Sequence, residues 1–132
     1  MPNQEERFVA GMSHVAVLFS ALGLALNIGL LVYYRQRSRF IAAHVKQALG
    51  LQVLSIILSW TVGLYVLFAG FGLGFGRIGP HFFFGKAMLT GLFLFLFNGV
   101  KLALVILGAI KGFGGQEYRL PLIGNLIAGI GE

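Results

Sequence analysis

Residues 12–34 read MSHVAVLFSALGLALNIGLLVYY, an apolar run in which Asn27 is the only strongly polar interior residue. A helix that crosses the hydrocarbon core of a bilayer needs about 20 apolar residues, and this run has about 23. It ends abruptly at the basic segment Arg35-Gln-Arg-Ser-Arg39. The pattern predicts a first transmembrane helix over about 12–34, preceded by a flexible N-terminus at 1–11.

Two further apolar runs follow, at about 48–71 and 82–110. The helix of the first run is expected to begin earlier, near Ser38, because serine is a favourable N-cap residue. Glycines between 70 and 76 and the pair Gly79-Pro80 mark its end. We therefore expect transmembrane helices at about 38–71 and 82–111.

The first turns of the second helix, residues 39–47, are expected to lie in the membrane interface. Phe40, Ile41 and Val45 would face lipid there, while Arg39, Lys46 and Gln47 would face headgroups.

The C-terminal tail, residues 112–132, contains an apolar segment at 120–130 that is too short to span a bilayer. It is predicted to be interfacial or re-entrant. The fold class expected is thus an all-α integral membrane protein with three transmembrane helices, built as a single domain over 1–132.

Composition supports this class. Hydrophobic residues make up 58% of the chain and charged residues 11%, whereas a soluble domain of this size carries roughly a quarter charged residues. The net charge of +6 lies in short segments between apolar runs, so it forms no continuous stripe for nucleic acid and instead fits anionic lipid headgroups. The absence of cysteine excludes disulfides, thiol catalysis and cysteine-based zinc sites.

The distribution of Lys and Arg predicts an orientation. With three crossings, six basic residues fall on one side: Arg35, Arg37, Arg39, Lys46, Lys111 and Arg119. Three fall on the other side: Arg7, Arg77 and Lys86. Because the richer side is usually cytoplasmic, we expect the N-terminus outside and the C-terminus in the cytoplasm, in a bacterial inner membrane.

Polar residues inside the apolar runs suggest a layer near the middle of the membrane, formed by Asn27, Ser55, Ser59, Asn98 and Lys101. Lys101 lies ten positions before Lys111, about 15 Å deep along a helix. A lysine at that depth costs about 2.5–3.5 kcal/mol and usually has a partner or a use, although its side chain can also snorkel to the interface.

Small residues recur every fourth position in the first two spans, ending at Gly29 and at Gly63, and such faces favour contact between helices.

Two polar motifs stand out. The run from Phe40 reaches His44, Gln47 and Ala48, and the tail reads Gly115-Gln-Glu-Tyr-Arg-Leu-Pro121. Together they resemble a bacterial three-helix membrane family of unknown function that is related to the Tic-twenty-type import component of the chloroplast inner envelope. The resemblance implies a component of a larger membrane machine, linked to protein translocation or assembly, and gives no chemistry.

If both motifs lie on one side of the membrane, Glu117 is the only acid near a basic surface. It would pair with Arg39, Lys46 or Arg119, or bond His44, and so clamp the tail to the first loop; otherwise the region is a solvated rim. The residues expected to interact are His44, Gln47, Glu117, Tyr118, Arg119, Pro121, Arg35, Arg39 and Lys46.

No enzyme is expected, since the spans contain no acid for a Ser-His-acid set and no phosphate-binding loop occurs. His14 and His81 could ligate a tetrapyrrole, but lone histidines at span ends are usually structural or solvated, so no cofactor and no metal is expected. The expected function is a non-catalytic accessory or scaffolding subunit. The alternative is an oligomeric channel or transporter for a small solute or anion that uses Lys101. The partners expected are an anionic bilayer, other membrane subunits or further copies of the chain, and no nucleic acid.

Overall fold

The computed structural model describes residues 1–71 and 80–118, and in these ranges the only regular structure is helical. The elements are α1 (Gln4–Ala16), the short 3-10 helix η1 (Val17–Phe19), α2 (Ser20–Tyr34), α3 (Arg39–Phe71) and α4 (Pro80–Phe113). Three stretches are long and apolar enough to cross a membrane: Gln4–Tyr34, Arg39–Phe68 and Phe84–Phe113. The predicted all-α membrane fold with three apolar helical stretches is confirmed, whereas the apolar tail segment at 120–130 lies outside the described residues.

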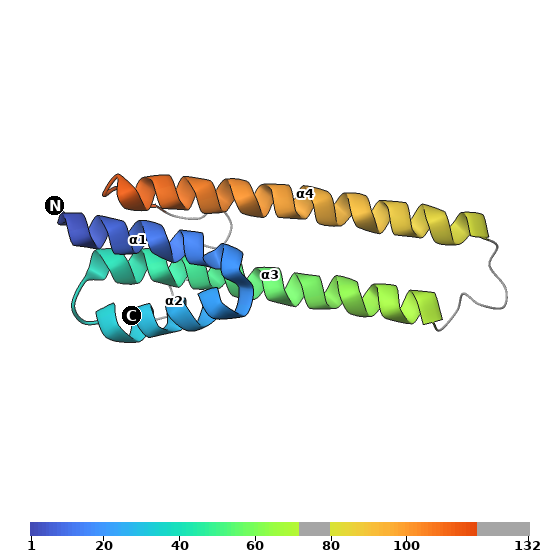
Figure 1. Cartoon of the computed structure of the whole chain (residues 1–132), viewed down its shortest axis with the longest axis horizontal. Helices are drawn as coiled ribbons and strands as arrows, with labels where there is room; N and C mark the ends of the chain where they lie inside the picture. The colour runs from blue at the N-terminus through green and yellow to red at the C-terminus, as the bar shows by residue number, and fades with distance from the viewer. Residues whose placement is uncertain (72–79, 119–132) are drawn as a thin grey trace. The chain divides into compact units, whose positions relative to one another are not determined.

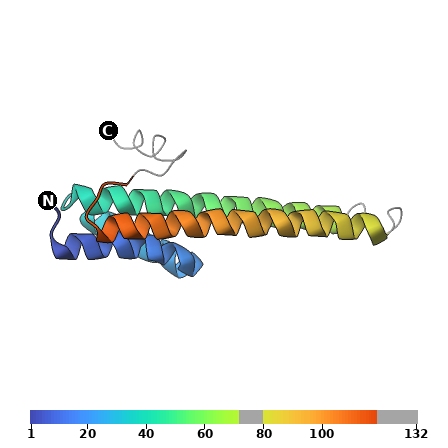
Figure 2. The same cartoon turned by 90° about the horizontal axis from the view of Figure 1, so that it is seen from above.

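The first apolar stretch is not one continuous helix. It folds back at η1, where Ser20 takes a left-handed backbone conformation (φ 48°) that is costly for a residue other than glycine. Side chains pair in antiparallel order along the two helices: Asn27 bonds the Ser13 carbonyl, and the Tyr34 hydroxyl bonds Glu5. Figure 1 and Figure 2 show α1 and α2 side by side in opposite directions. The expected single helix over 12–34 is therefore corrected to a helical hairpin.

The N-terminus is helical where a flexible segment was expected. Helix α1 begins at Gln4 because Asn3 and Glu6 form a capping box, in which each side chain accepts a hydrogen bond from the other residue's backbone N–H. This reciprocal pairing satisfies two amide groups that otherwise have no partner at a helix start.

Helix α3 begins where the sequence predicts. Ser38 accepts hydrogen bonds from the backbone N–H groups of Ile41 and Ala42, through its side chain and its carbonyl respectively. The expectation that Ile41 and Val45 face lipid is wrong, because both side chains are fully buried beside the hairpin.

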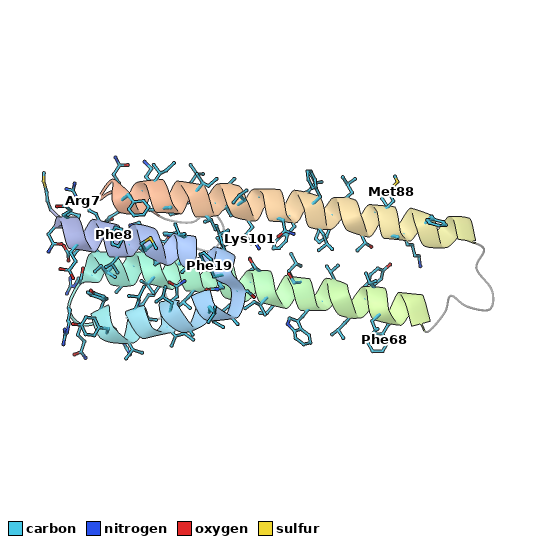
Figure 3. The ribbon with its side chains drawn as sticks, viewed as in Figure 1. Arg7, Phe8, Phe19, Phe68, Met88 and Lys101 are labelled. Atoms are coloured by element: carbon cyan, nitrogen blue, oxygen red, sulfur yellow. The ribbon has the colours of Figure 1, made fainter. Side chains whose placement is uncertain are left out.

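The chain forms two compact units. The first, here called the hairpin unit, comprises Met1–Val53 and the chain from Leu102 onward; the second comprises Leu54–Lys101. The core of the hairpin unit contains Val17, Ala48, Leu51 and Val105. In the second unit, large apolar side chains such as Phe68 and Met88 point outward from their helices (Figure 3).

Glycines let backbones approach closely inside the hairpin unit. A Cβ atom on Gly112 would lie 2.7 Å from the Gly11 nitrogen, and one on Gly108 would collide with the His14 ring. Gly108 and Gly112 are spaced as in the small-residue motif that brings membrane helices together. By contrast, Gly29 and Gly63, which end the small-residue faces seen in the sequence, have no described atom within 4 Å of such a Cβ.

Candidate functional site

Most buried polar side chains of the described chain gather in the hairpin unit. Buried polar groups are costly without hydrogen-bond partners, so their contacts show what the unit holds in place. The members on α1, α2 and α3 are Ser13, His14, Asn27, His44, Gln47 and Gln52.

One group of contacts joins the hairpin to α3 near the hairpin turn. The Gln52 amide donates to the Ser20 carbonyl at 2.6 Å, at the strained turn residue itself. The Asn27 amide donates to the Ser13 carbonyl at 3.0 Å and lies 3.4 Å from the Gln52 side-chain oxygen. The Ser13 carbonyl is among the last four of α1, which have no partner within that helix. The two bonds tie the arms of the hairpin to each other and to α3.

A second group is built around two buried histidines. His14 Nε2 lies 3.2 Å from His44 Nδ1, and His44 Nε2 lies 3.1 Å from the Gln116 carbonyl oxygen. A carbonyl can only accept, so His44 donates from Nε2, and its Nδ1 is the acceptor in the neutral ring. His14 then donates from Nε2, which leaves its Nδ1 unprotonated. The chain of contacts thus runs from α1 through α3 to the tail.

The tail is held to α3 by its backbone. Besides the His44 contact, the Gln47 amide donates to the Tyr118 carbonyl. The phenol ring of Tyr118 packs edge-on against His14, with ring centres 6.0 Å apart. Burial raises the pKa of the Tyr118 phenol above its ordinary value. His44, Gln47 and Tyr118, all expected at the site from the sequence, are therefore brought together.

The acid expected to clamp the tail, Glu117, has no hydrogen bond in this cluster, although its charge lies close enough to His44 to act on that ring. Glu117 is exposed and forms no ion pair with any residue of the described ranges, including Arg39 and Lys46. Arg39 is exposed and Lys46 half-buried, while Arg119 and Pro121 lie outside the described residues. Neutral side chains on backbone carbonyls hold the tail, since an exposed carboxylate loses little by staying in water.

Two buried polar atoms beside the histidines have no hydrogen-bond partner within the described part of the chain: His14 Nδ1 and the Tyr118 hydroxyl. The His14 ring packs against Gly108, and its other nitrogen faces His44. Neither His14 nitrogen therefore faces an open space for a tetrapyrrole. The side chain of His81 is outside the described residues. Over the same described ranges, no group of three or more His, Cys, Asp or Glu residues is placed to hold a metal ion.

The polar layer suggested near the middle of the membrane is described only residue by residue. Asn27 is buried in the contacts above, and Ser55 is buried as well. Ser59 and Asn98 are exposed, and the Asn98 amide donates to the Leu94 carbonyl of its own helix. Lys101 is half-buried. The layer remains a prediction from the sequence.

The basic residues gather differently from the sequence expectation. The Ser38 hydroxyl donates to Glu6 at 2.6 Å, and a Cβ on Gly115 would lie 2.6 Å from the Arg7 side chain. The start of α1, the loop before α3 and the start of the tail therefore lie at one end of the hairpin unit. Arg7, counted from the sequence on the side opposite the Arg35–Arg39 loop, thus lies at the same end of the hairpin unit as that loop, because the hairpin returns the chain to the end where it began.

Three residues of the site, Ser13, Gln52 and Gly108, were not expected there from the sequence. A signal for Gln52 was present: His44, Gln47, Gln52 and Ser55 recur at helical spacing and form one polar stripe on α3. Pairing of that stripe with α1 is a long-range contact that spacing along one helix does not reveal.

Comparison with known proteins places the chain. The family described as the magnetosome magnetite crystal formation protein family matches residues 5–127. No curated protein and no solved structure matches the chain. The resemblance to the Tic-twenty-type import component is therefore wrong: the match over nearly the whole length is to a different family. The motif residues His44 and Gln47 hold the tail within the fold.

Proposed function

Because the chain belongs to the magnetosome magnetite crystal formation protein family, we propose that it serves magnetite crystal formation as a small, non-catalytic subunit of the magnetosome membrane. Three stretches long and apolar enough to cross a bilayer support the membrane location. The family description supports the process. The role in protein translocation is dropped, since it depended on the mistaken resemblance.

The non-catalytic part of this proposal depends on the bonds that the buried polar residues form. Both His44 nitrogens are engaged within the fold, and Gln47 and Gln52 bond backbone carbonyls. A catalytic group needs a free functional atom within reach of a substrate. His44, Gln47 and Gln52 are committed to joining the hairpin, α3 and the tail, and the two unpartnered atoms beside them, His14 Nδ1 and the Tyr118 hydroxyl, are buried. The role of the cluster is structural: it joins the hairpin, α3 and the tail and so forms a surface at one end of the hairpin unit.

That surface is basic and would face the cytoplasm. With Arg7 moved to the side of the six basic residues counted above, seven Lys and Arg fall on that side and two, Arg77 and Lys86, on the other. An excess of this size is typical of cytoplasmic ends. We expect the surface to bind anionic headgroups and acidic segments of other magnetosome proteins, so that the subunit assists assembly from the cytoplasmic face.

The test is complementation in a magnetite-forming bacterium from which the corresponding gene has been deleted. The proposal expects crystals of altered number or size in the deletion strain, restored by the wild-type chain. A triple Arg→Gln variant at Arg35, Arg37 and Arg39 should reach the membrane but fail to restore them. Unchanged crystals in the deletion strain, or full rescue by the triple variant, contradicts the proposal.

Mild-detergent purification of the tagged chain, followed by mass determination, tests the subunit role separately. A stoichiometric partner or a defined homo-oligomer is expected, whereas a monomer without companions argues against it. The alternative of an oligomeric channel or transporter for a small solute or anion depends on Lys101, which is half-buried; a homogeneous homo-oligomer that conducts anions in liposomes would favour it over the subunit role.

A further inference from the structure

The hairpin is too short to cross a bilayer. Helix α1 has 13 residues and α2 has 15, which correspond to lengths of about 20 Å and 22 Å, while the hydrocarbon core is about 30 Å thick. Helix α3, with 33 residues, is about 50 Å long. The hairpin therefore enters a bilayer and returns to the side from which it came.

Two independent positions show how deep the turn reaches. Ser20, at the turn, bonds Gln52, which lies six residues beyond Lys46 on α3. Val17 packs in the same core cluster as Val105, which lies six residues before Lys111 on α4. Six helical residues span about 9 Å, so both helices place the turn about 9 Å beyond a basic residue. Measured instead from the base of the hairpin, the turn is about 20 Å away, the length of α1. With the base in a polar interface that is about 5 Å thick, the turn then reaches about 15 Å into the hydrocarbon core, so by both measures it stays within about one leaflet.

The surface of the hairpin fits acyl chains. Around the turn, large apolar side chains are exposed: Leu18 is 48% exposed, Phe19 62% and Leu22 79%. The exposure continues along α2 through Leu26 to Val32. In water such a continuous patch would drive association, whereas in lipid it needs no protein partner.

The base of the hairpin fits anionic headgroups. Arg7 lies in the first turn of α1, and Arg35 and Arg37 follow the end of α2. The Arg37 guanidinium lies 4.1 Å from the centre of the Tyr33 ring, and tyrosines and arginines are typical of the headgroup level. Figure 3 labels Arg7 near the base and Phe19 at the turn. A second copy of the chain would cover this apolar face less well than lipid, because aligning two hairpins side by side would bring the arginines at their bases together.

We infer that the α1–α2 hairpin inserts into only the leaflet on the side of the basic end, and that the protein therefore favours membranes that are convex on that side. Helices that cross the bilayer add similar area to both leaflets. The hairpin adds the cross-section of two helices, each about 10 Å wide, to one leaflet, and one-sided insertion makes binding sensitive to curvature. This goes beyond the proposed function, because it holds whatever partners the basic end recruits.

Sidedness is tested first, by using the natural lack of cysteine. Single variants Gln4→Cys, Gln36→Cys and Ile78→Cys are labelled with a membrane-impermeant maleimide in intact spheroplasts and again after lysis. The expected result is the same response at positions 4 and 36 and the opposite response at 78. Labelling of position 4 together with 78, and opposite to 36, overturns the inference by showing that the first stretch crosses the membrane.

Curvature preference is tested in reconstituted vesicles of several diameters that contain anionic lipid. An impermeant dye on Gln36→Cys counts only molecules whose basic end faces outward, with the hairpin in the convex leaflet. Their density should be at least about twofold higher in the smallest vesicles than in the largest, as expected for a curvature-sensitive insertion. A dye on Ile78→Cys counts the opposite orientation, whose density should fall. Densities independent of diameter in both orientations overturn the inference.

A matched pair of variants assigns the effect to the hairpin. The double variant Phe19→Ser with Leu22→Ser makes the turn polar and should remove the dependence on diameter. The control, Phe68→Ser with Met88→Ser, changes side chains that are 68% and 73% exposed outside the hairpin and should retain it. Helicity by circular dichroism confirms that each variant folds. Two results would show that lipid does not cover the turn: equal loss of the dependence on diameter in both double variants, or efficient cross-linking of Phe19→Cys between two copies of the chain.

Discussion

Gly23 offers the sharpest test of the hairpin packing, because Gly29 on the same helix is a natural control. A Cβ on Gly23 would collide with the Ala16 carbonyl oxygen and lie 2.6 Å from its carbonyl carbon, while the same atom on Gly29 has nothing described within 4 Å. Carbon atoms in good contact lie about 3.5–4.0 Å apart. Gly23→Ala thus places a methyl group about 1 Å too close to backbone atoms that cannot rotate away.

The magnitude follows from three contributions. Replacing glycine by alanine in a helix stabilises by up to about 1 kcal/mol, and both variants gain this. Overpacking costs about 1–3 kcal/mol at Gly23 only. Separating α1 from α2 also weakens the Asn27 and Gln52 hydrogen bonds, at about 1 kcal/mol each. We expect Gly23→Ala to be less stable than Gly29→Ala by about 3–5 kcal/mol.

The assay is the free energy of unfolding in mixed micelles titrated with sodium dodecyl sulfate and followed by circular dichroism. The wild-type chain and both variants are measured in the same detergent. Gly29→Ala should be equal to the wild type or slightly more stable, and Gly23→Ala clearly less stable. If Gly23→Ala matches Gly29→Ala, the close approach of Ala16 and α2 does not exist.

Three further predictions concern the caps and the tail. Asn3→Ala should lower the free energy of unfolding by about 1 kcal/mol in the same titration, because it removes the capping box. Asn3→Asp should retain most of the stability that the cap provides. Equal destabilisation by the two substitutions would refute the cap. Gln47→Ala should make the peptide bond after Lys111 more accessible to trypsin, because the Gln47 amide holds the tail. Glu117→Gln should leave this cleavage unchanged. Faster cleavage in Glu117→Gln and unchanged cleavage in Gln47→Ala would instead support an ionic clamp by Glu117. Because burial raises the pKa of the Tyr118 phenol, its contribution to stability is present below about pH 10, the ordinary pKa of tyrosine, and is lost as pH rises through the raised value. Above about pH 10 the wild-type chain should therefore lose more stability than Tyr118→Phe, as measured by circular dichroism. Identical dependence on pH in the two proteins would count against a buried phenol.

Local signals in the sequence predicted much of the fold. Ser38 was identified as the start of the second long helix from its residue type, and it caps α3 through both its hydroxyl and its carbonyl. Long apolar runs likewise predicted α3 and α4, since helix length and bilayer thickness are linked by a fixed rise per residue.

The hairpin was missed because length alone favoured a crossing. No proline or glycine pair marks the turn at 17–20, and the side chain that bonds the Ser20 carbonyl at this turn, Gln52, lies 32 residues away in the sequence. One local signal was available and was not used. Asn3 and Glu6 stand at the spacing of a capping box, and this predicts a helix that starts before the apolar run.

The sequence predicted which residues belong to the candidate site better than it predicted their hydrogen-bond partners. His44, Gln47 and Tyr118 were named from two motifs, and all three lie in the cluster. Electrostatic reasoning then selected Glu117 as the clamp, whereas the structure uses backbone carbonyls of the tail as acceptors. Such acceptors are present at every residue, so composition gives no hint of which ones will be used.

The most direct test of the account asks whether the first apolar stretch folds back. In the cysteine-free chain, Glu5→Cys and Tyr34→Cys are introduced together and treated with a short bifunctional maleimide in membranes, with each single variant as the control for linkage between copies. The native side chains lie 3.4 Å apart across 29 residues, a separation of about 44 Å in a continuous helix. The account predicts an efficient cross-link within one chain, seen by mass. No intramolecular product would mean that the stretch runs straight, and the hairpin, the shared basic end and the one-leaflet insertion would fail together.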